Sequence, residues 1–432
     1  MSENIKDKLE KIDKEHFSLL IDIGKVAKEE NLKAYLVGGM VRDILLRFNN
    51  LDMDIVVEAN ASKLATALVN KFPNCELSAK HDRFHTAKVI FTINGKKIPV
   101  DLASTREEVY EYPAALPKVN VSDLQKDLYR RDFTINALAV SLLPESFGEI
   151  VDLFNGLPDL KNKKIKILHD LSFIDDPTRI IRAVRFGAKL GFEIEAHTKQ
   201  LLDQAIDSRR FDNLIKKIRG DRVKIEIRYL FNLLNISQVL KDFFQFGIYR
   251  MISTKLEPCH TTTLINTSET NSIKQWLIYI AFIIKDLDKE TQEETLKNLQ
   301  LTGEEIKIIN NGLSAHKDLS TLILANKEIN SVTIYKELKE LAMESILITK
   351  LLFSSNKILL SLIDDYILNT SHIKLNITGQ DLISMGIKEG KTIGRILNKI
   401  LEVKIERPNM SQEDEILEAK KISTSTTNET EY

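Results

Sequence analysis

Apolar residues in the first third of the chain recur with two different spacings. Residues 16–32 carry apolar side chains three and four positions apart, which predicts an amphipathic helix, and similar helices are predicted at 40–48 and 61–72. Short apolar runs predict strands at 33–37, 53–58, 85–93 and 96–104. The dipeptide Asn94-Gly95 between the last two runs predicts a hairpin. Because strands and helices do not alternate regularly, we expect a small α+β domain with a largely antiparallel sheet.

After about residue 150 the strand pattern nearly disappears. Helical spacing dominates at 175–192, 197–207 and 219–234 and continues to about residue 421. Residues 423–432 are polar and poor in apolar side chains, which predicts a disordered tail. We therefore predict an α+β head at 1–148, a helical neck at 149–235 and a helical body and tail at 236–422.

The overall charge of the chain is close to balanced. Its 432 residues have a formal net charge of −1, so no global basic field indicates a nucleic-acid partner. Residues 161–228 nevertheless contain 17 Lys and Arg against 10 Asp and Glu. Such a surplus fits either a solvated helical face or an electrostatic footprint for RNA. The two cysteines are far apart and no segment resembles a secretion signal or a membrane span, so we expect a cytoplasmic protein.

The stretch "LDMDIVVE" places Asp52 and Asp54 one residue apart at the start of a predicted strand. Residues i and i+2 of a strand face the same side, at roughly 7 Å spacing, so the two carboxylates should lie together. Carboxylate pairs bind hard divalent cations, and Mg²⁺ is typically held by one or two of them together with substrate phosphates. The alternative is that the aspartates cap a turn or face solvent.

Two neighbouring stretches favour a phosphate ligand. Gly38-Gly39 between a predicted strand and helix allows close approach of the backbone, and Arg42 could grip a phosphate with its planar fork. Asp101 ends another predicted strand and could add a third carboxylate beside the pair, with Arg106 close behind. Each feature alone has a simpler reading, a plain turn for the glycines and a strand-terminal turn for Asp101.

Four motifs in order resemble the bacterial class II tRNA nucleotidyltransferases, the CCA-adding enzymes and their poly(A) polymerase relatives in the DNA polymerase β superfamily. The motifs lie at residues 35–58, 100–119, 127–140 and 175–194, the third containing "RRDFTINA" and the fourth "DDPTRIIR". The resemblance implies a polymerase-β-like head and template-independent transfer of CMP and AMP from CTP and ATP to the tRNA 3′ end, with release of pyrophosphate. It also implies two Mg²⁺ ions held by Asp52 and Asp54.

The resemblance further implies a set of nucleotide-binding residues: Gly38, Gly39, Arg42, Arg106, Arg131, Asp132, Asn136, Asp176, Arg179, Arg182 and Arg185. Asp176 and Arg179 would imitate a base-pairing partner, because a carboxylate accepts from the amino group shared by cytosine and adenine. The alternative for Asp176-Pro177 is an ordinary helix N-cap, and both roles could coexist. Asp175 departs from the usual family glutamate, and His85 stands where relatives often carry glycine.

Contacts with the tRNA acceptor stem are expected from basic residues of the helical region, because an A-form stem is recognised by shape and phosphate. These residues are Lys161, Lys163, Lys164, Arg209, Arg210, Lys216, Lys217 and Arg219. Three products other than CCA remain open: CC-only addition, A-only addition and poly(A) synthesis. A non-catalytic RNA-binding relative is the alternative of another class.

Overall fold

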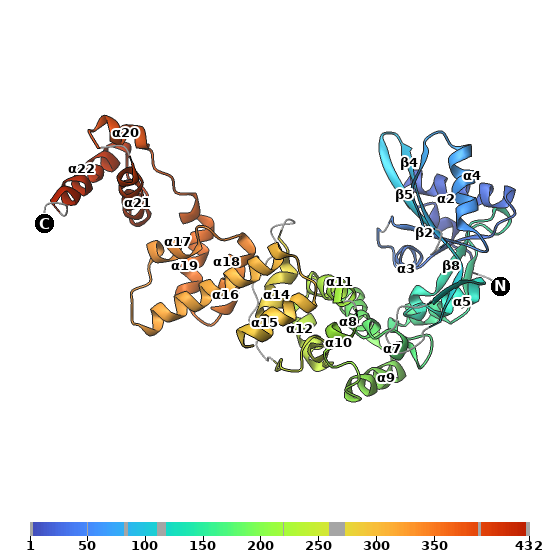
Figure 1. Ribbon diagram of the computed structural model, residues 1–432. Helices are drawn as coiled ribbons and strands as arrows, with labels where there is room; N and C mark the ends of the chain where they lie inside the picture. Colours follow the sequence, from blue (N-terminus) through green and yellow to red (C-terminus); the bar gives the residue numbers. More distant parts are fainter. Residues whose placement is uncertain are drawn as a thin grey trace. The chain divides into compact units, whose positions relative to one another are not determined.

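The computed structural model describes residues 3–49, 51–81, 85–109, 118–218, 220–258, 273–387 and 390–428. The chain forms two compact units, residues 1–258 and 259–432 (Figure 1). The boundaries expected at 148 and 235 both fall inside the first unit. The prediction of an α+β head followed by a mostly helical remainder is confirmed.

A seven-stranded sheet forms the centre of the head, in the order β3-β4-β5-β2-β1-β8-β9. Its strands are β1 Ala34–Val37, β2 Met53–Val57, β3 Cys75–His81, β4 Thr86–Ile93, β5 Lys96–Ser104, β8 Leu138–Ser141 and β9 Ile150–Asp152. Strand β2 pairs with β5 in parallel, and the other described pairs of this sheet are antiparallel. The predicted hairpin joins β4 to β5, with positive φ angles at both Asn94 and Gly95.

The larger core of the head lies between the sheet and helices α2 Lys14–Glu29 and α4 Ala61–Lys71. Alternate residues of β4, such as Val89 and Phe91, are buried there, as the period of a strand requires. Helix α2 approaches the sheet closely at Gly24, where a Cβ atom would lie 1.8 Å from the carbonyl oxygen of Leu142. A smaller cluster of buried residues includes Val37 and Val56 of the sheet with Leu128.

Shorter elements of the head lie between and beside these strands. They are α1 Lys6–Leu9, α3 Gly39–Leu45, β6 Arg106–Val109, β7 Lys118–Val121, α5 Leu124–Tyr129 and the 3₁₀ turns η2 Thr134–Asn136 and η3 Pro144–Ser146. Strands β6 and β7 pair with each other as a separate antiparallel ribbon.

The rest of the first unit is mostly helical, with one short parallel pair of strands. Its elements are α6 Gly156–Lys161, β10 Lys164–Ile165, α7 Ser172–Asp175, α8 Thr178–Leu190, β11 Glu193–Ile194, α9 Ala196–Asp207, α10 Leu214–Lys217, α11 Gly220–Phe231, α12 Ile236–Gln245 and α13 Tyr249–Ile252. Helix α8 is strongly amphipathic, with Ile180, Ile181 and Val184 buried. It packs against α11, which supplies several side chains of the site described below.

The second unit is helical throughout its described residues. Its elements are α14 Gln275–Ile284, α15 Lys289–Asn298, α16 Gly303–Leu324, α17 Ser331–Leu338, α18 Met343–Leu352, α19 Lys357–Leu368, η4 Thr370–His372, α20 Gly379–Ser384, α21 Lys391–Glu406 and α22 Gln412–Asn428. A buried ion pair joins Lys404 to Glu415, and the Glu415 carboxylate also accepts from the backbone N–H groups of Asn376 and Ile377.

The C-terminal helix and the length and polarity of the described helices bear on two of the sequence predictions. Residues 423–428 continue α22, since Ser and Thr are only slightly poorer helix formers than the residues before them, and the disordered tail at 423–432 stays a prediction. Residues 429–432 lie outside the described residues. Over the described part of the chain, every helix is too short or too polar to cross a bilayer.

Candidate active site

Two strands bring acidic side chains together at the centre of the sheet. Met53 is buried at the start of β2, whereas Asp52 and Asp54 on either side of it are exposed, so the two aspartates share one face as predicted. Asp101 of β5 is the direct register partner of Asp54. We call Asp52, Asp54 and Asp101 the acidic face. Lys88 of β4 lies beside it, with its Nζ 3.0 Å from Asp101 Oδ2.

The electrostatics of the acidic face favour a bound cation. Desolvation and the neighbouring Asp101 carboxylate raise the pKa of Asp54, with a further contribution from Asp52, against the opposing influence of Arg131 and Lys88. Among the described residues, no three His, Cys, Asp or Glu side chains are gathered closely enough to surround a metal ion. Mg²⁺ is usually coordinated by one or two protein carboxylates, with substrate phosphates as further ligands, and the acidic face fits that arrangement.

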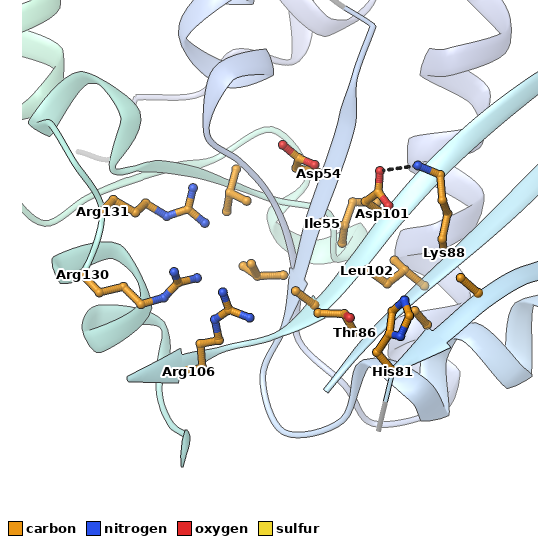
Figure 2. A pocket seen from close by; sticks show the side chains of 15 residues that line it. Asp54, Ile55, His81, Thr86, Lys88, Asp101, Leu102, Arg106, Arg130 and Arg131 are labelled. Atoms are coloured by element: carbon orange, nitrogen blue, oxygen red, sulfur yellow. Dashed lines mark hydrogen bonds and ion pairs between the residues drawn. The ribbon is translucent and has the colours of Figure 1, made fainter. Parts of the chain in front are cut away.

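Two pockets meet at Asp54. The sheet pocket, of about 370 Å³, is lined by residues of β2, β4 and β5 together with Arg106, Arg130 and Arg131 (Figure 2). The arginine pocket, of about 700 Å³, is lined by Gly38, Gly39, Asp54, Asp132, Asn136, Asp176, Ile225, Glu226 and seven arginines, among other residues. Asp54, Arg130 and Arg131 line both. A group bound in either pocket would therefore lie next to the same carboxylate.

Three arginines, Arg106, Arg130 and Arg131, lie together on one side of the sheet pocket (Figure 2). Arg130 and Arg131 both pair with the buried carboxylate of Asp127, at 2.7 and 3.0 Å. The Nε atoms of Arg106 and Arg131 are buried without a hydrogen-bond partner among the described residues. Burial and the nearby Arg130 also lower the pKa of Arg106. Donors left unsatisfied in this way are suited to an incoming anion.

The turn before α3 supplies the predicted glycine pair. Gly38 has a φ of +74°, and a Cβ atom there would lie 3.1 Å from Arg131 Nη1, so a side chain at this position would be strained and would crowd the arginine. Arg42 is buried and donates to Asp43 Oδ1 and to Asn136 Oδ1, both at 2.7 Å. These bonds hold the Arg42 guanidinium against Asn136 of the third motif, and Arg42 lines the arginine pocket.

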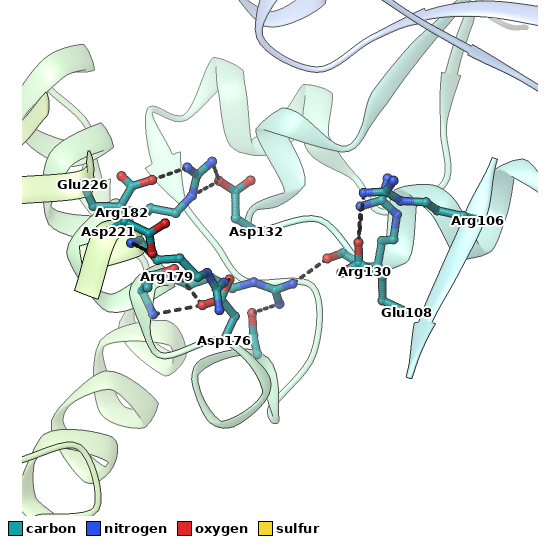
Figure 3. A network of polar contacts seen from close by, with 12 residues as sticks. Arg106, Glu108, Arg130, Asp132, Asp176, Arg179, Arg182, Asp221 and Glu226 are labelled. Carbon is teal, nitrogen blue, oxygen red and sulfur yellow. Dashed lines mark hydrogen bonds and ion pairs between the residues drawn. The ribbon is translucent and has the colours of Figure 1, made fainter. Parts of the chain in front are cut away.

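A continuous polar network runs from Asp132 through Arg182 to Glu226 of α11 (Figure 3), and Asn136 joins it at Asp132. Asn136 donates to Asp132 Oδ1 at 2.9 Å, and Arg182 donates to Asp132 Oδ2. Glu226 of α11 then accepts from both Arg182 and Arg185, at 2.7 and 2.9 Å. Burial alone would raise the pKa of Asp132, but Arg182 and the hydrogen bonds from Asn136 and Phe133 N–H outweigh it and lower that pKa.

Asp176 and Arg179 both line the arginine pocket. Asp176 Oδ1 accepts from the backbone N–H of Thr178 at 3.1 Å and from its hydroxyl at 2.6 Å, so the carboxylate caps the start of α8. Its Oδ2 accepts from Arg222 at 2.8 Å. Arg179 donates to Ser172 Oγ and to the backbone carbonyl of Arg130. The predicted cap is present, and a base-recognition role stays a prediction.

The two departures from the family pattern lie in different surroundings. Asp175 ends α7, with its carboxylate 4.0 Å from the His169 imidazole, and burial raises its pKa. His85 has a φ of +50°, a conformation that favours glycine, which gives a physical reason for a glycine at this position.

The structure brings together most of the predicted site residues but not all of them. Asp52 lines neither pocket, and Arg106 lines only the sheet pocket. The predicted RNA-contacting residues line neither pocket: Lys161, Lys163, Arg209, Arg210, Lys216 and Lys217 are exposed, and Lys164 pairs with Glu193. Arg219 lies outside the described residues.

Sequence reasoning missed several polar residues that line the pockets, among them Lys88, Arg130, Arg222 and Glu226. Lys88 carries no distinctive local pattern, and Arg130 is the first residue of "RRDFTINA" but was not among the expected nucleotide-binding residues. Arg222 and Glu226 lie in "GDRVKIEI", one helical turn apart, and that spacing was the signal that could have placed both on one face of a helix.

Comparison with known proteins agrees with this geometry. Residues 34–166 match the family described as the poly A polymerase head domain, and residues 268–420 match the putative tRNA nucleotidyltransferase domain 2. An A-adding tRNA nucleotidyltransferase of Geobacter sulfurreducens is 31% identical over 94% of this chain, and one of Aquifex aeolicus is 36% identical over 62%. This chain spans only 47% and 33% of the length of those two relatives.

Solved structures match over nearly the whole chain. A CCA-adding enzyme in its apo form II shares 31% identity with a TM-score of 0.81, covering 98% of this chain and 99% of that one. The Thermotoga maritima CCA-adding enzyme complexed with tRNA shares 30% identity with a TM-score of 0.79, covering 96% of this chain and 98% of its own. Similar CCA-adding enzymes form complexes with ATP and with CTP. The chain belongs to the tRNA nucleotidyltransferase and poly(A) polymerase family.

Proposed function

We propose that the protein is a template-independent nucleotidyltransferase that adds CMP and AMP from CTP and ATP to the 3′ end of tRNA and releases pyrophosphate. The observation that carries the proposal is the position of Asp54, whose carboxylate lies where two pockets meet and beside a second carboxylate, Asp101. A transfer reaction needs two substrates that meet at one group of catalytic side chains. The arginine pocket would take the nucleoside triphosphate.

The groups that hold the nucleotide follow from the lining of the arginine pocket. The backbone turn at Gly38 and the guanidinium of Arg131 would face the triphosphate, because both line the arginine pocket together with Asp54 and lie close to each other. Arg182 and Asp132 form an ion pair and would line the part of the pocket between the triphosphate and the base. Asp176 and Arg179 would meet the base itself, the carboxylate accepting from an amino group and the guanidinium donating to ring acceptors.

The chemical step joins the terminal 3′ oxygen of the RNA to the α-phosphorus of the nucleotide and breaks the bond from that phosphorus to pyrophosphate. The hydroxyl proton passes to Asp101 on the acidic face. Asp52 and Asp54 would hold Mg²⁺ together with phosphate oxygens, and the bound metal would supply Lewis-acid stabilisation of the attacking and leaving oxygens. Asp54 keeps both substrates next to one carboxylate, which converts the reaction into an effectively unimolecular step.

Addition of A alone is the second candidate. Both curated relatives described above are A-adding enzymes, whereas the solved structures that cover the whole chain are CCA-adding enzymes. The same pocket serves either activity, because Asp176 faces an amino group in cytosine and in adenine alike. The exposed basic residues from Lys161 to Lys217 would contact the phosphates of the acceptor stem in both cases.

Transfer to defined tRNA ends tests these proposals. Transcripts ending at the discriminator base, after one C and after two C would be incubated with CTP, ATP or both, and the product ends sequenced. Completion of all three ends to CCA is the expected result. Addition only to the transcript ending in CC identifies an A-adding enzyme, long A tails identify a poly(A) polymerase, and absence of any transfer refutes the proposal.

A further inference from the structure

We propose that Arg222 is a positioning residue that fixes the Asp176 carboxylate and thereby determines which bases the arginine pocket accepts. The inference rests on the proposed function of that pocket as a nucleotide site. Arg222 is the third residue of α11 and lines the pocket, although it stands 46 positions from Asp176 in the chain.

The contacts of Asp176 leave its carboxylate little freedom to rotate. Oδ1 is held from one side by the N–H and hydroxyl of Thr178, at 3.1 and 2.6 Å. Oδ2 is held from α11 by Arg222 Nη2 at 2.8 Å. Both partners are largely shielded, with 15% of the Asp176 side chain and 28% of the Arg222 side chain exposed. The two oxygens are thus anchored by different elements, and the plane of the carboxylate is set by both.

A fixed carboxylate can select among bases because an ionised carboxylate only accepts hydrogen bonds. Each oxygen has lone pairs beyond those already used, so Asp176 can accept from a base without releasing Arg222. Cytosine and adenine present an amino group at the relevant edge, whereas uracil and guanine present a carbonyl there, which would face another acceptor. A site built around one hydrogen bond rejects the analogue that lacks the donor far more strongly than a flexible site does.

The role of Arg222 is distinct from that of its neighbour on α11. Glu226, one turn later, pairs with Arg182 and so acts on the side of Asp132 (Figure 3), and it also pairs with Arg185. Arg222 acts on Asp176, where the base would lie. Loss of Glu226 should weaken binding of every nucleotide, whereas loss of Arg222 should change the ratio between nucleotides.

Equilibrium binding of CTP, ATP, UTP and GTP to the full-length protein tests the inference without tRNA. Arg222→Met removes the contact, Arg222→Lys restores a positive charge, and Arg228→Met makes the same change on an exposed face of the same helix. We expect Arg222→Met to reduce the preference for CTP and ATP over UTP and GTP by about tenfold, the equivalent of one well-placed hydrogen bond. Arg222→Lys should recover part of it, and Arg228→Met should leave it unchanged.

Three outcomes would overturn the inference: a wild-type protein that binds the four nucleotides equally, a variant that weakens all four by one factor, or equal effects of Arg222→Met and Arg228→Met. Thermal unfolding of each variant shows whether it is folded. The proposed function is tested separately by transfer to tRNA. A protein that transfers nothing but loses base preference on Arg222→Met would refute the proposed function and leave the role of Arg222 intact.

Discussion

Asp54 on β2 lies directly opposite Asp101 on β5, as register partners in a parallel pair of strands. Two like charges in this position repel each other, and desolvation together with that repulsion raises the pKa of Asp54. Lys88 offsets part of this negative charge through an exposed ion pair with Asp101, but it lies on β4, on the side of β5 away from Asp54. The arrangement destabilises the sheet locally unless a cation comes between the carboxylates, which is the arrangement expected of a site built for function.

Replacing Asp54 by asparagine should abolish transfer while leaving the fold intact. The substitution removes one carboxylate from the junction of the two pockets and relieves the repulsion with Asp101. We expect a loss of about a thousandfold or more in transfer rate, because a metal held by this carboxylate would stabilise the charge of the transition state by several kcal/mol. Single-turnover transfer of CMP to tRNA measures the loss, and the unfolding temperature should stay the same or rise slightly.

The control for this variant is Glu76→Gln, on an exposed position of β3 in the same sheet. It makes the same kind of change in charge away from both pockets and should transfer at the wild-type rate. An Asp54→Asn protein that retained transfer within tenfold of wild type would show that the Asp54 carboxylate is not required for transfer.

The sequence allowed much of this site to be predicted, because its central features are local. The spacing of Asp52 and Asp54 in a strand, the Gly38-Gly39 turn and the capping of α8 by Asp176 each depend on a few consecutive residues. The pairing of Asp54 with Asp101 does not, since it requires β2 and β5 to be parallel neighbours although other strands lie between them in the chain. Composition and periodicity carry no information on such a register.

Two different physical reasons explain why the sequence did not predict strand β3 and the contacts of α11. Strand β3 is exposed at most of its positions, so it shows no alternation of apolar and polar residues. The contacts of α11 were missed for the other reason, distance along the chain: Glu226 reaches Arg182 across 44 residues. Helical spacing identified α8 and α11 separately but could not orient one against the other.

Replacing Gly38 by alanine should affect nucleotide binding more than stability. The positive φ of Gly38 makes any side chain cost about 1 to 2 kcal/mol, and the added Cβ would press on the guanidinium of Arg131. We expect KM for CTP to rise about tenfold, because 1.4 kcal/mol of lost interaction corresponds to that factor. Gly303→Ala, where an added Cβ meets nothing within 4 Å, is the matched control and should leave KM unchanged.

Replacing Glu226 by glutamine should destabilise the first unit, because two arginines lose their common anionic partner. Arg185 is nearly buried, and burial already lowers its pKa against the influence of Glu226. We expect a loss of about 2 to 3 kcal/mol in the free energy of unfolding, less than for a fully buried pair because Arg182 is partly exposed. Chemical denaturation measures the change, and Glu193→Gln, at an exposed ion pair, should have a much smaller effect on the free energy of unfolding. Equal effects of the two substitutions would contradict the network's role.

The stabilising effect of Asp132 should depend on pH in one direction only. Its folded-state pKa lies below the ordinary value, so its contribution is fully present above the unfolded pKa of about 3.9 and is lost as the pH falls through the folded value. At pH 7 we expect Asp132→Asn to lower the free energy of unfolding by about 2 to 3 kcal/mol, because Arg182 loses its charged partner. The difference from wild type should stay constant down to pH about 4 and shrink below it. Asp170→Asn, at an exposed carboxylate, controls for general acid sensitivity. A difference that persists unchanged at pH 3 would mean that packing, and not the ionised carboxylate, accounts for the contribution of Asp132.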